Sequence, residues 1–225
     1  MCSQKRKPRL TPLTDGPYKV EGLEKLTDSR GRPIPVKKTF LLCRCGGSKT
    51  KPFCDGTHAR IGFTSRRPEK QAAKEPKRRD YPGAHLTIHD IRCICSHAEY
   101  CTRCSPQVFR RDKFPWIDPD GEEPGKVIKT IKMCPSGALS YSVDGVEHRD
   151  LDAEPEIYIE SNGPYCVRGG VELVGYSLEK AASHEHYTLC RCGQSRNLPR
   201  CDGSHHKAGF SDAGRQDGDE PRTRD

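Results

Sequence analysis

Three cysteines and one histidine occur twice in the chain with the same spacing, Cys-x-Cys-x8-Cys-x3-His. The two sets are Cys43, Cys45, Cys54 and His58, and Cys190, Cys192, Cys201 and His205. Alternate side chains of an extended segment share a face, so Cys43 and Cys45 are placed to bind one metal atom. Residues four apart meet across a helical turn, which brings Cys54 and His58 together. Two ligand pairs per set suit a two-iron cluster, although three thiolates and one imidazole also form structural zinc sites.

The residues between the third cysteine and the histidine predict a short helix. Asp-Gly suits a tight turn, and Thr57 or Ser204 follows it as the expected helix cap. Upstream of each set, Val, Tyr, Leu and Phe bounded by Gly and Pro predict short strands. These strands cover residues 18–26 and 39–42, and then 165–174 and 187–189.

The two sets belong to a longer internal repeat. Residues 16–63 align with residues 163–210 without a gap, at a constant offset of 147, and 19 of the 48 positions are identical. A match of this length indicates a duplication rather than a chance recurrence of a short motif.

A third group of cysteines lies between the repeats. The segment His85–Arg92 alternates like a strand, residues 123–133 form an amphipathic helical pattern, and residues 157–159 predict another strand. Cys93, Cys95, Cys101 and Cys104 follow the first strand, and Cys134-Pro135 follows the helix. A cysteine cluster with a remote Cys-Pro is how a bacterial ferredoxin binds its cluster, through C-x2-C-x2-C.

On that spacing, Cys95, Cys101 and Cys134 are the first, third and remote ligands, and Ala98 occupies the second place. Three thiolates suit a 3Fe–4S cluster, whereas a 4Fe–4S cluster needs another donor on its fourth iron. Cys93 or Cys104 could supply it, but a buried or redox-silent thiol is the plainer interpretation of each. Zinc bound by four cysteines is the alternative for this group.

The duplicated motif resembles that of the CDGSH iron–sulfur family, the mitoNEET-like proteins. The second copy reads Cys-Asp-Gly-Ser-His at residues 201–205, and the first copy differs by Thr57. The resemblance implies a 2Fe–2S cluster in each set, with the two closely spaced cysteines on the inner iron and the third cysteine and histidine on the outer one. Members with one motif work as intertwined dimers, so the resemblance implies that the two repeats pack as a pseudo-symmetric pair.

The middle segment, residues 86–141, is similar to the divergent single-cluster ferredoxin domains. The similarity includes residues 115–120 and the Cys134-Pro135 turn, and those domains also lack the second cysteine. It implies one 3Fe–4S or 4Fe–4S cluster in this segment.

Composition limits the fold class. Only 32% of the 225 residues are apolar, against about 45–50% in an ordinary domain. With 13 cysteines, metal rather than a large core is expected to hold small units together. We therefore predict an α+β protein of small, irregular, metal-stapled domains. Its two CDGSH repeats form a pseudo-dimeric β-rich unit with a ferredoxin-like insert.

The predicted organisation has six parts. They are a basic flexible tail (1–15), the first CDGSH repeat (16–63), a basic linker (64–82), the divergent ferredoxin-like domain (83–155), the second CDGSH repeat (156–210) and a disordered tail (211–225). A secreted disulfide framework is the alternative use of so many cysteines. Residues 1–13 contain no apolar run, so we expect no signal peptide, no membrane span and a cytoplasmic location.

The net charge of +8 is concentrated in residues 5–9 and 66–79, where no aromatic side chains interleave with the basic ones. We therefore expect an acidic protein partner rather than a nucleic acid. No nucleophile with a base partner and no phosphate-binding loop is found, which predicts a protein that is not an enzyme.

The predicted function is one-electron transfer by two 2Fe–2S clusters and one 3Fe–4S or 4Fe–4S cluster. The expected partner is a soluble redox protein or an apo iron–sulfur acceptor, and the expected state is a monomer with an internal pseudo-dimer. The alternatives are cluster transfer or redox and pH sensing, because a histidine ligand can be protonated near neutral pH, and a zinc-stapled adaptor for nucleic acid or protein.

Overall fold

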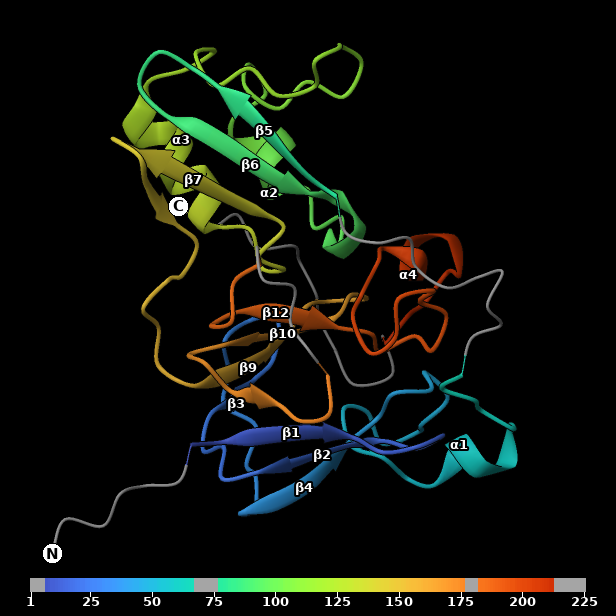
Figure 1. The fold of residues 1–225 in the computed structure, drawn as a ribbon. Coiled ribbons are helices and arrows are strands. Elements are labelled where there is room, and N and C mark those ends of the chain that lie inside the picture. Colours follow the sequence, from blue (N-terminus) through green and yellow to red (C-terminus); the bar gives the residue numbers. More distant parts are fainter. Residues whose placement is uncertain (1–6, 67–76, 177–181, 213–225) are drawn as a thin grey trace, which may run out of the picture.

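A computed structural model describes residues 7–66, 77–176 and 182–212. Strands dominate it, and they form three four-stranded sheets (Figure 1). Two of the sheets lie in the lower half of Figure 1 and contain the two repeats, and the third forms the middle unit at the top. No helix in the described ranges is long and apolar enough to cross a membrane.

Each repeat sheet contains three strands of its own repeat and one short strand of the other. The first has the order β11-β1-β2-β4, formed by Glu172–Leu173, Arg9–Pro12, Tyr18–Glu21 and Thr39–Leu42. The second has the order β12-β10-β9-β3, formed by Tyr187–Leu189, Tyr165–Arg168, Glu156–Ile159 and Leu26–Thr27. The exchanged strands pair in parallel, Leu10 opposite Leu173 and Leu26 opposite Ile157. Backbone hydrogen bonds therefore join the repeats.

A shared hydrophobic core lies between the repeats. Alternate residues of the strands, such as Leu10, Val20, Leu42, Ile157 and Leu189, are fully buried in it. This is the pattern of a strand that buries one face. At its centre the rings of Tyr18 and Tyr165 meet edge to face, with centroids 6.0 Å apart. The core is assembled from both halves of the chain, so neither repeat buries its own apolar face alone.

The middle unit is an antiparallel sheet with helices on one face. The sheet has the order β5-β6-β7-β8, formed by Arg78–Pro82, Thr87–Ile91, Leu139–Val143 and Val146–His148. The short helix η2 (Arg92–Ile94) follows β6, and helices α2 (Tyr100–Cys104) and α3 (Pro124–Lys132) precede β7. Helix α3 begins with Pro124, its cap Glu123 accepts a hydrogen bond from the Gly125 N–H, and it buries Val127 and Ile131.

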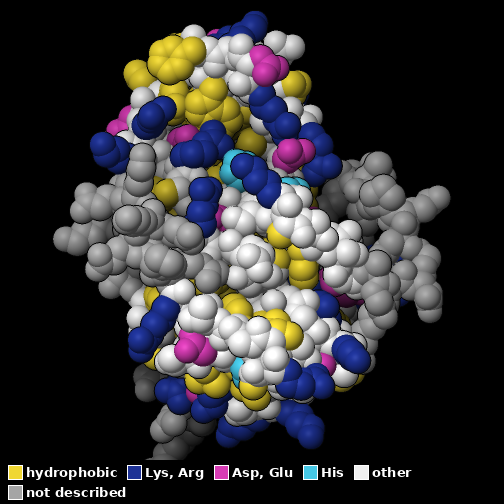
Figure 2. Space-filling view, turned by 90° about the vertical axis from the view of Figure 1, so that its right-hand side faces the viewer, with side chains coloured by type: hydrophobic (Ala, Val, Ile, Leu, Met, Phe, Trp, Pro, Cys, Tyr) yellow, Lys and Arg dark blue, Asp and Glu magenta, His cyan; other side chains and the backbone are white. Residues whose placement is uncertain are grey.

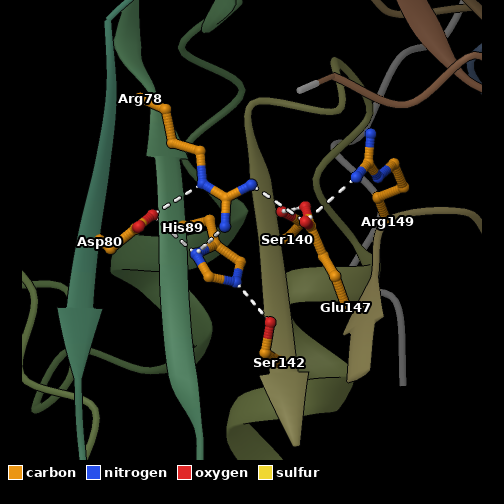
Figure 3. A network of polar contacts seen from close by, with 7 residues as sticks. All are labelled: Arg78, Asp80, His89, Ser140, Ser142, Glu147 and Arg149. Carbon is orange, nitrogen blue, oxygen red and sulfur yellow. Dashed lines mark hydrogen bonds and ion pairs between the residues drawn. The ribbon is translucent and has the colours of Figure 1, made fainter. Parts of the chain in front are cut away.

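A polar network crosses this sheet from β5 to β8 (Figure 3). Nδ1 of His89 lies 2.8 Å from Asp80, and its Nε2 lies 2.7 Å from the Ser142 hydroxyl. The series resembles a catalytic triad, but Arg78 also lies 2.7 Å from the same Nδ1 and forms an ion pair with Glu147 at 2.9 Å. Neither His89 nor Ser142 lines any of five well-formed cavities of the described residues. We interpret the network as structural, because its side chains connect neighbouring strands of the sheet.

Two strands lie where the sequence predicted irregular chain. Strand β1 lies inside the expected tail, and Leu10 is fully buried there. Strand β5 lies inside the expected linker and pairs along its whole length with β6. Strand β5 is rich in charged residues and β1 contains only one apolar aliphatic residue, Leu10, so neither strand shows an alternating apolar pattern. Pairing with neighbouring strands of the fold determines both. Residues 1–6, 67–76 and 213–225 of the predicted tails and linker lie outside the described residues.

The side chain of Glu185 connects residues 151–153, which precede the second repeat, with the end of β10. Its carboxylate accepts hydrogen bonds from the N–H groups of Leu151, Ala153 and Gly169, at 2.7–3.2 Å. These bonds and the neighbouring His186 lower the pKa of Glu185 to about 2, although burial opposes them.

We expect Glu185→Gln to lower the free energy of unfolding of the iron-loaded chain by about 2 kcal/mol, because a charged acceptor is lost from three N–H groups. A carboxylate with a lowered pKa stabilises the fold above its unfolded pKa, and this contribution is lost as the pH falls through about 4.5 toward 2. The difference between parent and variant, measured by urea unfolding, should therefore be constant from pH 6 to 8. Glu172→Gln, at an exposed glutamate of β11, is the control. A difference that shrinks between pH 8 and 6 would contradict this role.

Candidate functional site

The first donor set begins where β4 ends. Cys43 and Cys45 follow Leu42, and their sulfur atoms lie 3.8 Å apart on the same side of the chain. Helix α1 (Thr57–Arg60) places His58 beside Cys54, with Nδ1 3.3 Å from Sγ. The spacing therefore brings the four donors together as the two predicted pairs.

The second donor set repeats this arrangement at the end of β12. The sulfur atoms of Cys190 and Cys192 are 3.6 Å apart. Helix α4 (Ser204–Lys207) brings His205 Nδ1 to 3.4 Å from Cys201 Sγ. None of the twelve described cysteines of the chain forms a disulfide.

These separations fit ligands of tetrahedral metal atoms. With metal–sulfur bonds of about 2.3 Å, two thiolates on one metal lie about 3.8 Å apart. A thiolate and an imidazole on one metal lie about 3.5 Å apart by the same geometry. Among the described residues, no group of three or more Cys, His, Asp or Glu side chains is arranged to hold a single ion. The donors of each set are thus positioned as two separate pairs.

Hydrogen bonds around the sulfur atoms favour negatively charged thiolates. The N–H groups of Gly47 and Gln194 point at Cys45 and Cys192, each at 3.4 Å. The hydrogen bond between the sulfur atoms of the first pair lowers the pKa of Cys43 to about 6 and raises that of Cys45. The pair therefore holds one proton near neutral pH, and binding a metal displaces it.

The helix that carries each histidine is capped differently from the prediction. Thr57 and Ser204 are the first helical residues rather than caps, and a glycine in the left-handed conformation precedes each of them. The carboxylates of Asp55 and Asp202 instead accept hydrogen bonds from the N–H groups of Thr57 and Ser204, both at 3.0 Å. The Asp-Gly pair therefore supplies both the turn and the acceptor.

The predicted ligands of the middle unit line one cavity. Cys95, Cys101 and Cys134 face it from η2, α2 and the turn after α3, and Ala98 lines it with them. The cavity is small, about 30 Å³, and is partly open to solvent. Burial raises the pKa of Cys95, and it raises that of Cys101 to about 12. The fold therefore brings the three predicted cysteines and Ala98 to one cavity.

Cys93 and Cys104 are not among the residues that line this cavity. Sequence reasoning missed three other residues that do line it, namely Asp90, Arg92 and Trp116. Burial raises the pKa of Asp90, and the Arg92 guanidinium lies over the Trp116 ring and 3.7 Å from the sulfur of Cys95. The strand pattern placed Asp90 and Arg92 close to the cysteines, but only the fold turns them toward the same cavity.

The middle unit touches the second donor set. Asn197, in the loop between Cys192 and Cys201, donates a hydrogen bond to the backbone carbonyl of Cys93 at 3.2 Å. Tyr100 donates to Glu160, which precedes β10 of the second repeat, at 3.3 Å. The middle cavity and the second donor set therefore lie side by side across this contact.

Two groups of cysteine and histidine donors and one group of cysteines indicate a metal-binding protein. The family described as "Iron-binding zinc finger CDGSH type" matches residues 15–59 and 162–206. The family described as "Divergent 4Fe-4S mono-cluster" matches residues 81–144. The chain belongs to the CDGSH iron–sulfur proteins, in a form whose two CDGSH motifs flank a divergent 4Fe–4S domain.

Part of the chain is similar in sequence to two bacterial proteins. "Uncharacterized protein YjdI" from Escherichia coli strain K12 and its namesake from Escherichia coli O157:H7 are each 37% identical to it over 71 residues. That alignment covers 32% of this chain and 93% of each relative. No solved structure matches the chain.

Proposed function

We propose that the chain is a one-electron carrier, and not an enzyme, with a 2Fe–2S cluster in each CDGSH motif and a 3Fe–4S or 4Fe–4S cluster in a ferredoxin-like middle domain. The observation that carries this proposal is the contact between the middle unit and the second donor set, through Asn197 and Tyr100. Electrons pass between two clusters only when the clusters lie close together. Structural zinc sites have no such requirement.

Bound clusters supply the redox chemistry, and the protein supplies the donors and limits access to them. Cys43, Cys45 and Cys190 are 2%, 8% and 1% exposed, so the inner donors are kept from water. Cys54 and His58 are only half-buried. The proposed ligands therefore place one side of the first site near the surface, which suits exchange of electrons with another protein.

The repeats are proposed to form an internal pseudo-dimer. Two reciprocal contacts support it. Tyr18 donates hydrogen bonds to the carbonyls of Cys190 and Pro199, and Tyr165 donates to those of Cys43 and Pro52, all at 2.9–3.0 Å. Gly46 and Gly193 face the other repeat so closely that a methyl group on either would lie within 3 Å of a carbonyl oxygen. Each repeat thus holds the ligand loop of the other, and we expect a monomer.

The proposed partner is an acidic redox protein in the cytoplasm. Figure 2 views the side of the molecule that carries α1 and α4, where Lys and Arg side chains gather in several places. Lys49 and Lys51 belong to the first ligand loop, and Arg60 ends α1. Positive charge around an electron-transfer site steers an acidic partner to it.

Cluster donation to an apo iron–sulfur protein is the second candidate, and the exposure of Cys54 and His58 favours it. A single experiment separates the two functions. The iron-loaded, reduced chain is mixed without oxygen with an acidic one-electron acceptor protein, and separately with apo-ferredoxin. Electron carriage predicts that the acceptor is reduced while iron stays on this chain. Transfer of iron and sulfide to apo-ferredoxin, with no reduction of the acceptor, would instead support donation.

The histidine donors should control how stable the bound clusters are in acid. We expect His58→Cys and His205→Cys to retain iron and to lower the reduction potential of the altered site, because a thiolate adds negative charge where imidazole is neutral. His58→Cys should also bleach more slowly at pH 6 than the parent, since the ligand that can be protonated is gone. Burial lowers the pKa of His205 to about 4, so His205→Cys should differ from the parent only at a lower pH. Visible absorption followed over time at pH 6 and pH 8 measures both rates. Equal rates at pH 6 in the parent and His58→Cys would contradict ligation by His58.

A further inference from the structure

One histidine of the middle unit lies directly on the second CDGSH motif. The ring of His97 covers Gly203 so closely that a methyl group there would lie 2.4 Å from Cδ2. The backbone carbonyl of His97 lies 3.3 Å from Nε2 of His206, the residue after the proposed ligand His205. His97 itself is two residues after Cys95. It therefore connects the loop of the middle donors with the helix of the second histidine donor.

Among the described residues, the first motif has no equivalent contact. Gly56 is the counterpart of Gly203, and a methyl group at Gly56 would meet nothing within 4 Å. The backbone is the same at both positions, with φ of 83° and 82°. Cys201 and His205 are 2% and 6% exposed, whereas their counterparts are half-buried. In Figure 1, α4 lies next to the middle unit and α1 lies at the far end of the repeats.

The loop that carries His97 is shaped for this contact. His97 and Glu99 both have positive φ, 58° and 64°, which is uncommon for residues other than glycine. Such a conformation costs free energy and persists where the surroundings require it. Here the surroundings include the Asn197 hydrogen bond to Cys93 and the Tyr100 hydrogen bond to Glu160, on either side of the loop.

We propose that His97 is a positioning residue that docks the middle unit on the second CDGSH motif and thereby makes the two motifs unequal. The second motif faces the middle donor set within the chain, and the first motif is left open to other proteins. Under the proposed function, the second motif exchanges electrons with the middle site, and the first motif exchanges them with other proteins. The docking itself does not depend on that function.

A matched pair of variants tests the docking. Gly203→Ala places a methyl group against His97, and Gly56→Ala places one in open space with the same backbone strain. We expect Gly203→Ala to speed amide hydrogen exchange in residues 92–104 and 201–208 of the iron-loaded chain by about tenfold. Gly56→Ala should leave residues 92–104 unchanged. Adding Gly203→Ala to His97→Ala should speed exchange in residues 201–208 no further than His97→Ala does alone, because the methyl group then has no ring to meet. Equal exchange in the two glycine variants would overturn the proposal.

His97→Ala alone keeps the test valid if Gly203→Ala does not fold. It should change the reduction potential of one CDGSH site and leave that of the other unchanged, which a purely structural residue would not do. Unchanged potentials at both sites, with unchanged exchange in residues 201–208, would also overturn the proposal. If the exchange pattern is as expected but the chain reduces no acceptor protein, the docking stands and the proposed function fails.

Discussion

Ala98→Cys should add one iron to the middle site. A middle site held by three thiolates alone gives the paramagnetic signal of an oxidised 3Fe–4S cluster, and the variant should give a stable 4Fe–4S cluster that is diamagnetic when oxidised. The reason is positional: Ala98 lines the same cavity as Cys95, Cys101 and Cys134, and its methyl group offers no donor. A thiolate at this place completes the C-x2-C-x2-C arrangement. Iron analysis and electron paramagnetic resonance of both proteins measure the change.

Cys93→Ser and Cys104→Ser are the controls for this substitution. Neither residue lines the cavity, so neither variant should alter the iron content or the spectrum of the middle site. A parent that already contains a 4Fe–4S cluster, degraded only by one of these two changes, would identify that cysteine as the fourth ligand. An Ala98→Cys protein with unchanged iron and spectrum would contradict the ferredoxin-type arrangement.

Removing iron should disorder the two ligand regions, with strands β4 and β12 that lead into them, more than the rest of the sheets. Helices α1 and α4 have only four residues each, too few to be stable in isolation. Their positions depend on Cys54, His58, Cys201 and His205 being held by metal. We expect iron-free protein to lose most amide protection in residues 39–63 and 186–210. Strands β2 and β10 should keep more protection, because Val20 and Val167 are buried in the shared core.

Hydrogen exchange of the loaded and iron-free chains measures this difference, and reloading with iron and sulfide is the control for reversibility. Full protection of residues 39–63 and 186–210 without iron would show that the core, rather than the metal, orders them. Equal loss throughout the chain would show that even the sheets depend on metal.

The sequence predicted the donors better than it predicted the elements around them. Strand β4 has the predicted bounds, and Cys43 and Cys45 follow it, because an alternating strand before a Cys-x-Cys pair is a local pattern. Strand β1 could not be predicted in this way. Its pairing with β11 joins residues 9–10 to residues 172–173, and only Leu10 of the segment is buried.

The surroundings of the donors depend on contacts between distant parts of the chain. Tyr18 and Tyr165 looked like ordinary strand residues, yet each holds the ligand loop of the other repeat. His97 lies near a cysteine cluster in sequence, but its contact with Gly203 requires the middle unit and the second repeat to be folded against each other. No local pattern carries that information.

The most direct test of the central claim is the amount of iron and acid-labile sulfide in the purified chain, with its visible spectrum. Two 2Fe–2S clusters and one cluster of three or four irons predict about seven or eight iron atoms and about eight sulfides per chain, with absorption above 400 nm. Zinc in place of iron, with no sulfide and no visible absorption, would contradict the assignment of all three donor sets to iron–sulfur clusters.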